Sequence, residues 1–114
     1  MTGVQTCALP IYIFVRNVNA WSQQRRIAAS DPTNYAEFGA SVSISEEHAI
    51  VGAHAETDDE TGGNTLIGAG AAYIFLRHDT AWTQLQKVVA SDRAADDQFG
   101  VSVAIDGDHA LIGA

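Results

Sequence analysis

The chain has few of the residues that mark several common protein classes. Its 114 residues include one cysteine, two prolines and only six lysines and arginines, against fourteen aspartates and glutamates, and the formal net charge is -8. Nucleic acid and anionic membranes require a basic surface, so this balance argues against both as partners. No run of about 18 apolar residues occurs, which argues against insertion into a membrane. An acidic surface of this kind still tolerates cations.

The first eleven residues share no pattern with the rest of the chain. Residues 1–11 contain no basic residue and no long apolar stretch, so they are not a signal peptide. They resemble the translation of a sequencing adapter, and we interpret them as an artefactual or disordered leader. The only cysteine, Cys7, lies in this leader, so the sequence predicts no disulfide, metal site or redox compartment from it.

Two copies of one pattern fill the remaining chain. Residues 12–16 read YIFVR and residues 73–77 read YIFLR, while FGASVSI at 38–44 returns as FGVSVAI at 99–105. The match continues without a gap for about 42 residues at an offset of about 61, with about 19 identities. A fixed offset over this length indicates structural repeats.

Each segment of the repeat predicts a β-strand. Residues 38–44 alternate apolar and small polar side chains, residues 49–53 form a short apolar run, and residues 72–77 are aromatic and β-branched. Residues 82–90 are more polar and include Lys87, as expected for an exposed outer strand. Four antiparallel strands per repeat, with no segment of 3.6-residue period, predict one β-propeller blade per repeat.

Turn residues support these strand boundaries. Asp106-Gly107 stands between two apolar runs and predicts a tight hairpin, because this pair tolerates positive φ. Residues 45–47 hold the equivalent place in the first copy, and residues 62–64 and 78–80 break the other connections.

The order of these motifs resembles a known repeat family. Phe-Gly-x-Ser-Val-x-Ile followed by Ile-Val-Gly-Ala or Leu-Ile-Gly-Ala resembles the FG-GAP repeat of integrin alpha-subunit propellers and of bacterial secreted proteins. The Ala-Tyr-Ile-Phe, Ala-Trp and Ala-Ser-Asp motifs fit the bacterial subtype best. The resemblance implies an all-β fragment of a β-propeller, with one complete four-stranded blade flanked by two half-blades. We assign residues 12–37 to the outer strands of a preceding blade and its connection, 38–91 to the complete blade, and 92–114 to the inner strands of the next.

The resemblance gives its motif residues structural roles. Phe38 and Phe99 are expected between blades, and Gly39 and Gly100 allow the backbone to approach closely. Trp21 and Trp82 are expected to pack against a neighbouring strand rather than to stack on a ligand. The structural motif residues are Phe38, Gly39, Gly52, Trp82, Phe99, Gly100 and Gly113.

Several polar groups could form a site, and each has a structural interpretation that we favour. The acidic group between the second and third strands lacks the Asp-x-Asp-x-Asp-Gly spacing of calcium loops, so we expect a solvated loop; its members are Glu56, Asp58, Asp59 and Glu60. A second acidic group is expected to form turns between blades; its members are Asp92, Asp96 and Asp97. The repeated pair His48 and His109 is expected to be structural. The repeated pair Ser41 and Ser102 lies in no recognisable catalytic triad motif.

Two departures from the family pattern bear on calcium. His54 stands where a proline often ends the Gly-Ala-Pro motif, and the acidic calcium loop between the first two strands is missing at 45–47 and 106–108. We therefore predict no cofactor and no tight calcium site, because this turn is too short to surround an ion with oxygens. Calorimetry that shows submillimolar affinity, lost in Asp106→Ala and Asp108→Ala, would contradict this prediction.

The resemblance implies a non-catalytic module that binds or adheres outside the cell or at a bacterial cell surface. Its loops would contact a protein or glycan, and the remaining blades of a parent propeller would be its other partners. Two alternatives stay open: a calcium-dependent adhesion propeller, and an accessory propeller of a larger secreted hydrolase. Because the neighbouring blades are incomplete, we expect residues 49–53 and 110–114 to be partly open to water. Residues 12–114 alone should then be marginally stable and aggregate or oligomerise.

Overall fold

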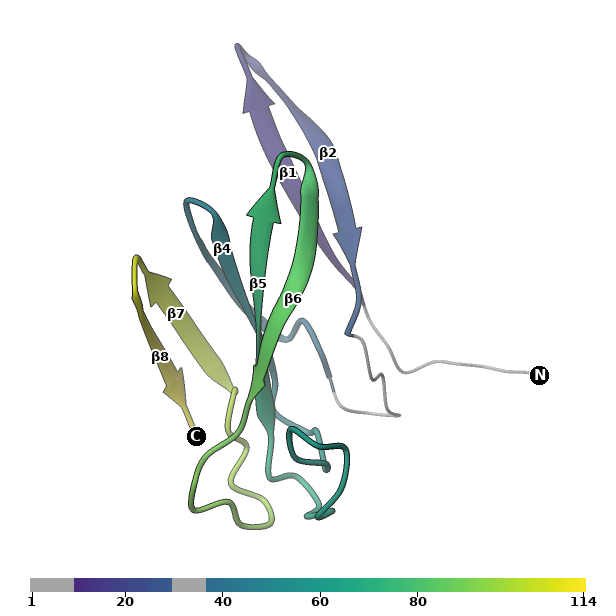
Figure 1. Ribbon diagram of the computed structural model, residues 1–114, viewed down its shortest axis with the longest axis vertical. Helices are drawn as coiled ribbons and strands as arrows, with labels where there is room; N and C mark the ends of the chain where they lie inside the picture. Colours follow the sequence, from purple (N-terminus) through teal and green to yellow (C-terminus); the bar gives the residue numbers. More distant parts are fainter. Residues whose placement is uncertain (1–9, 30–36) are drawn as a thin grey trace, which may run out of the picture.

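The computed structural model describes residues 10–29 and 37–114. These residues form eight strands in three antiparallel sheets of two, four and two strands (Figure 1). No helix occurs in the described ranges, so none is present there that could cross a membrane. Residues 1–9 of the predicted leader lie outside the described residues, as does the connection at 30–36. Ile11 was also assigned to the leader, but it begins a strand, Ile11–Asn17, because it pairs with Ile27 and packs against the core. The predicted all-β fold, a complete blade between two half-blades, is confirmed.

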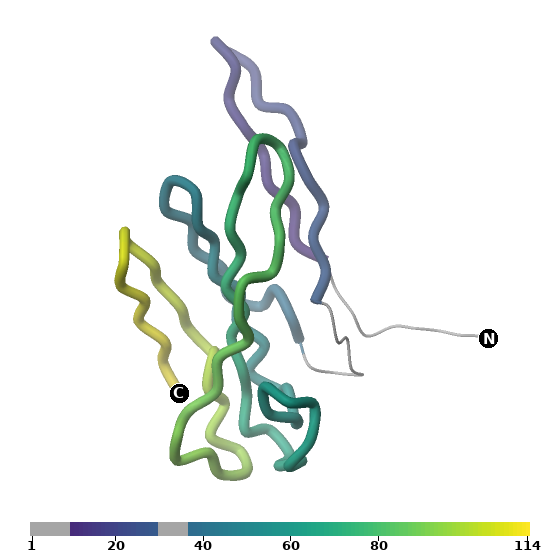
Figure 2. The backbone as a smooth tube through the Cα atoms, in the orientation of Figure 1, coloured from purple at the N-terminus to yellow at the C-terminus, as the bar shows by residue number. Residues whose placement is uncertain are grey.

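The central sheet is the complete blade, and one hairpin lies on each side of it (Figures 1 and 2). Its strands, in hydrogen-bonded order, are β3 (Ser41–Ser45), β4 (His48–Ala53), β5 (Ala71–His78) and β6 (Ala81–Val88). The hairpins are β1 (Ile11–Asn17) with β2 (Ala20–Ile27), and β7 (Ser102–Asp106) with β8 (His109–Gly113).

The sequence repeat is also a repeat of backbone geometry. The β1–β2 pair shifts register between Ile13 and Phe14, and the β5–β6 pair shifts at the equivalent Ile74 and Phe75. The β7–β8 hairpin has the register of β3–β4. The residues that lead into these inner hairpins match too, because Gly39 and Gly100 both have a φ of 96°.

Two element boundaries differ from the sequence-based expectation. Residues 38–44 were expected to form one strand, but β3 begins at Ser41. The backbone turns before it, since Glu37 has a φ of 61° and its carbonyl accepts a hydrogen bond from the amide of Ala40 at 3.1 Å. In the last hairpin, Asp106 ends strand β7, and the positive φ falls on Gly107 at the first position of the two-residue turn. Glycine is favoured there because it has no Cβ.

The hydrophobic core lies between the central sheet and the β1–β2 hairpin. Its members are Ile13, Ile27, Phe38, Ala49, Val51, Ala53, Ala71, Tyr73, Phe75 and Trp82. The ring of Phe38 meets Tyr73 and Phe75 edge-to-face, with centroids 5.3 and 6.2 Å apart. Phe38 therefore packs where the complete blade meets the preceding half-blade.

The other face of the complete blade meets the β7–β8 hairpin. Ser41 Oγ donates to the carbonyl of Gly100 at 2.8 Å, and Ser43 Oγ accepts from the amide of Ile105 at 3.2 Å. A Cβ on Gly52 would overlap the Gly100 carbonyl oxygen and Ser41 Oγ, so the two backbones can approach only because Gly52 has no side chain. Alternate residues of β3 thus face the next blade through serine side chains.

Strand β4 is covered on both faces, which corrects the expectation that residues 49–53 are open to water. Ile50 and Val51 are both 0% exposed. The core with β1–β2 covers the face that carries Val51, and strand β7 lies against the sheet on the opposite side. The expectation holds for the other copy, where Leu111 of β8 is 75% exposed.

The two repeated tryptophans have different surroundings. Trp82 is buried, and its Nε1 donates to Gln24 Oε1 of β2 at 2.8 Å. Trp21 is 66% exposed, with the guanidinium of Arg16 over its ring at 6.0 Å. In the described part of the chain, Trp21 therefore meets the neighbouring strand β1 through Arg16 alone, and most of its ring stays exposed. The β1–β2 hairpin covers Trp82, and within the described residues no further sheet covers Trp21 in the same way.

Candidate functional site

Two long connections gather at one end of the molecule and form the candidate site (Figure 1). They are residues 54–70, between β4 and β5, and residues 89–101, between β6 and β7. Backbone hydrogen bonds join them, from the amides of Asp96, Gln98 and Phe99 to the carbonyls of Ile67, Gly68 and Ala69 at 2.8, 2.8 and 2.9 Å. The two connections therefore form one continuous surface that spans two neighbouring blades.

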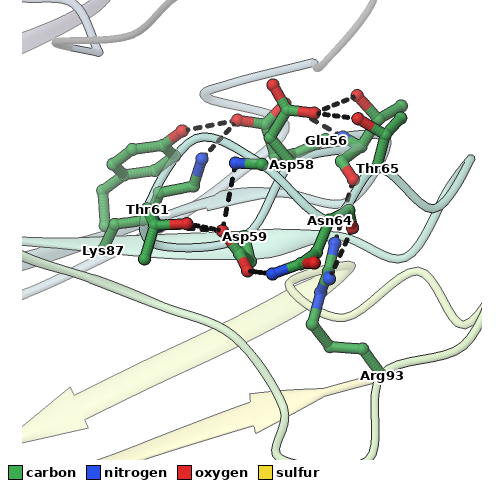
Figure 3. Close-up of polar contacts among 11 residues, drawn as sticks. Glu56, Asp58, Asp59, Thr61, Asn64, Thr65, Lys87 and Arg93 are labelled. Carbon is green, nitrogen blue, oxygen red and sulfur yellow. Dashed lines mark hydrogen bonds and ion pairs between the residues drawn. The ribbon is translucent and has the colours of Figure 1, made fainter.

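Asp59 organises the first connection from its centre (Figure 3). Its Oδ1 accepts hydrogen bonds from the amide of Thr61 at 2.9 Å, from Thr61 Oγ1 at 2.6 Å and from the amide of Gly63 at 3.2 Å. Its Oδ2 accepts from Asn64 Nδ2 at 2.5 Å. The hydrogen bond from the Asn64 side chain has the largest effect on this carboxylate, and the one from the Thr61 side chain has the next largest. Both stabilise the charged form and hold the pKa of Asp59 well below its usual range. Both oxygens of this carboxylate are thus used to fold the loop.

Glu56 joins the same connection to the sheet below it. Its side chain is fully buried, and its Oε2 accepts from Lys87 Nζ at 2.7 Å and from the hydroxyl of Tyr73 at 3.0 Å. Its Oε1 accepts from the amide of Thr57 at 2.9 Å. A buried carboxylate requires this kind of compensation, because desolvation of the charge is unfavourable. Lys87, from β6, is itself buried.

The solvated-loop interpretation of the acidic group is therefore wrong for two of its members. Glu56 and Asp59 are buried, and Glu60 is exposed. The expectation that Lys87 lies on an exposed strand is wrong as well, because the loop folds over the end of β6 and places Glu56 against its ammonium group.

Arg93 connects the two loops. Its Nη1 donates to the carbonyl of Asn64 and its Nη2 to the carbonyl of Thr57, both at 2.9 Å (Figure 3). Asp58 adds a contact within the first loop, since its Oδ1 accepts from Thr65 Oγ1 at 2.9 Å. The planar, multiply donating guanidinium suits the bridging of two carbonyls on separate turns.

The second acidic group lies on the surface of the second connection. Its members Asp92, Asp96 and Asp97 are exposed. Asp96 has a φ of 65°, and the amide of Asp97 donates to the carbonyl of Ala94 at 3.3 Å. These features are typical of turn residues.

The repeated histidines and serines lie apart from this site. His48 is half-buried opposite Leu76, and His109 is exposed at the β7–β8 turn. The hydroxyl of Ser41 donates to a backbone carbonyl at the blade junction rather than to a histidine. His54, at the position where the family pattern often has proline, contacts Glu37 Oε1 at 3.0 Å.

Sequence reasoning missed Lys87, Tyr73 and Arg93, which hold the loops in place. Nothing in the local pattern of β6 marks Lys87 as buried. The Asp-Glu-Thr-Gly-Gly-Asn run at 59–64 did contain a usable signal, because aspartate followed by threonine and glycine commonly hydrogen-bonds its own turn. Within residues 10–29 and 37–114, no three or more His, Cys, Asp or Glu side chains are grouped so as to hold a metal ion. The calcium prediction itself stays a prediction.

Comparison with known proteins gives one family. The family model described as the FG-GAP repeat matches residues 21–75 and 82–114. No curated protein and no solved structure matched the chain.

Proposed function

The chain belongs to the FG-GAP repeat family, and from this premise we propose that it is a non-catalytic module for extracellular binding or adhesion. Its ligand would be a protein or a glycan, bound through the β4–β5 and β6–β7 loops. FG-GAP repeats occur in extracellular proteins and in integrin-like propellers, which supports this class of function by analogy.

The observation that carries the proposal is the rigid fixing of these two loops. Asp59 holds the turn of the first loop, Glu56 attaches it to the sheet, and Arg93 attaches it to the second loop. A surface that is already ordered loses little conformational entropy when it binds, so more of the contact energy becomes affinity.

The exposed residues of this surface suggest how a ligand would be recognised. Ile67 is 73% exposed, and its carbonyl accepts a hydrogen bond from the amide of Asp96 at 2.8 Å. The two loops also carry further exposed acidic side chains, which are Glu60, Asp92 and Asp97. Carboxylates accept hydrogen bonds from sugar hydroxyls and pair with basic side chains, while the isoleucine offers an apolar contact. The surface therefore suits a glycan or a basic protein segment.

Binding of the purified chain to a glycan array and to an array of extracellular matrix proteins tests the proposal. We expect at least one ligand to bind wild-type protein, and Glu60→Lys or Ile67→Asp to reduce that binding by about tenfold or more. Glu46→Lys is the matched control, because Glu46 is an exposed glutamate in the β3–β4 turn at the opposite end of the sheet. The absence of any ligand, or equal effects of Glu60→Lys and Glu46→Lys, would contradict the assignment of these loops.

A further inference from the structure

We propose that the free edge of β1, with the groove beside it, binds the β7–β8 hairpin of a second copy of this chain. The repeat geometry of the chain supports this pairing independently of the proposed function. It predicts a head-to-tail assembly, in which one end of each copy completes the incomplete blade of the next.

An apolar groove lies between β1 and the central sheet. It has a volume of about 260 Å³ and is lined by residues 11–14 of β1, residues 42–44 of β3, and Ala49 and Ile50 of β4. Tyr12, Phe14, Val42 and Ile44 are each about half exposed there. Among the described strands, β1 is hydrogen-bonded to β2 alone, so no described strand pairs with its other edge, and an unpaired strand edge can take a further strand.

The complete blade shows which element fits this edge. The β1–β2 hairpin has the sequence pattern and the register shift of β5–β6. In the complete blade, the inner edge of β5 is hydrogen-bonded to β4 of the β3–β4 hairpin. The hairpin of the same type and register is β7–β8, whose strand β8 is hydrogen-bonded to β7 alone among the described strands. Within its own chain this hairpin already lies on the opposite side of the central sheet, so in an assembly of this chain a second copy would supply it.

The register of the proposed pairing follows from that of β4 with β5. Ile50 pairs with Ile74 in the complete blade. The equivalent pair across two copies is the second copy's Leu111 with Ile13. Ile50 is fully buried, whereas Leu111 is 75% exposed. Association would place the second copy's Leu111 in the groove beside Val42 and Ile44, and would remove these apolar surfaces from water.

The serine contacts of the blade junction have counterparts in this assembly. Ser41 donates its hydroxyl hydrogen to the carbonyl of Gly100, and Ser102 and Gly39 hold the equivalent positions. The second copy's Ser102 would therefore donate to the carbonyl of Gly39. The amide of Gly39 donates to the carbonyl of Gly52 at 3.0 Å, and the amide of Gly100 donates to the carbonyl of Gly113 at 2.8 Å. The backbone at Gly39 is therefore held in the same way as the backbone at Gly100, whose carbonyl accepts from Ser41.

The two contacting surfaces differ from each other, so the interface is heterologous. Such interfaces generate either closed rings or open filaments. Each copy would contribute one complete blade and, with its neighbour, one shared blade. Propellers close with about 4–8 blades, so rings of two to four copies satisfy the geometry.

Light scattering coupled to size-exclusion chromatography tests the association. We expect the 114-residue chain to give a mass of two to four copies at high concentration, and Leu111→Glu to give a monomer. Because Leu111 is exposed in the single copy, this substitution leaves its fold intact. Ile67→Glu is the matched control, since Ile67 is an exposed apolar residue of the β4–β5 loop, apart from both strand edges, and should leave the mass unchanged. A wild-type monomer at every concentration would overturn the proposal.

Cysteine cross-linking tests the register. In a Cys7→Ser background, Ile13→Cys and Leu111→Cys are made on separate chains and treated with oxidised glutathione as the oxidant, first alone and then mixed. Paired strands bring the Cα atoms within disulfide range, about 5.5 Å, so the mixture should form a linked dimer and neither variant alone should do so. Homodimers of either single variant, or no linkage in the mixture, would contradict head-to-tail pairing.

Discussion

At the scale of single residues, positive φ angles set the turns of this fold. The first turn residue has a positive φ in all four hairpins among the described residues: Val18, Glu46, Asp79 and Gly107. Only Gly107 carries no Cβ penalty for this conformation.

Gly107→Ala is therefore expected to destabilise the protein by about 1–2 kcal/mol, because alanine disfavours positive φ. A Cβ at this position would meet no atom within 4 Å, so the effect would come from the backbone alone. Gly63→Ala is the control, since a Cβ on Gly63 would also have room and this residue has no positive φ. This substitution should leave the free energy of unfolding unchanged or raise it by up to about 1 kcal/mol. Urea unfolding of both variants measures the difference, and equal effects would contradict the backbone explanation.

Asp59 gives the protein a predictable response to acid. Its donors hold its pKa in the folded state below the ordinary value of the unfolded chain. The carboxylate therefore contributes stability in full above that ordinary value, near pH 4, and this contribution declines as the pH falls further.

Asp59→Asn should be less stable than wild type at pH 6 and should lose less stability between pH 5 and pH 3. Glu60→Gln, an exposed change in the same loop, should keep the wild-type pH dependence. Denaturant unfolding at a series of pH values tests both. If the free energy of unfolding of Asp59→Asn fell with pH as steeply as that of wild type, another group would cause the acid sensitivity.

At the scale of elements, the sequence predicted strands well because period and repetition are local signals. The alternation at 38–44 and the apolar run at 49–53 correspond to β3 and β4. The burial of Lys87 and Glu56 could not be read locally, because it depends on a loop that crosses over the end of β6. The exposure of Trp21 likewise depends on which sheet lies beside β2, which no pattern within β2 encodes.

The junction between blades depends on glycine at one face of β4. Gly52→Ala should destabilise the protein by more than about 2 kcal/mol, because its Cβ would meet the backbone oxygen of Gly100 and overpacked sites relax poorly. Gly113→Ala is the control at the equivalent position, where the Cβ would meet chiefly the movable side chain of Ser102. The difference in unfolding free energy should be more than about 1 kcal/mol. Equal costs would show that the Gly52–Gly100 approach does not stabilise the junction.

At the scale of the whole molecule, the complete blade is the stable centre and the two hairpins are held on its faces. Its strand β4 is covered on both sides, while β1 and β8 each have one edge open within the described structure. Stability in stacked repeats is shared across the interfaces between neighbouring repeats. The outer hairpins should therefore unfold locally before the central sheet does.

Amide hydrogen exchange on the monomeric Leu111→Glu variant tests this arrangement most directly. We expect the slowest exchange in β4 and β5, at Ile50 and Tyr73, and exchange about a hundredfold or more faster in β1 and β8. In a Gly52→Ala background, the protection of β7 should fall before that of β5. Uniformly fast exchange, or greatest protection in the β1–β2 hairpin, would contradict the claim that a complete four-stranded blade forms the centre of this chain.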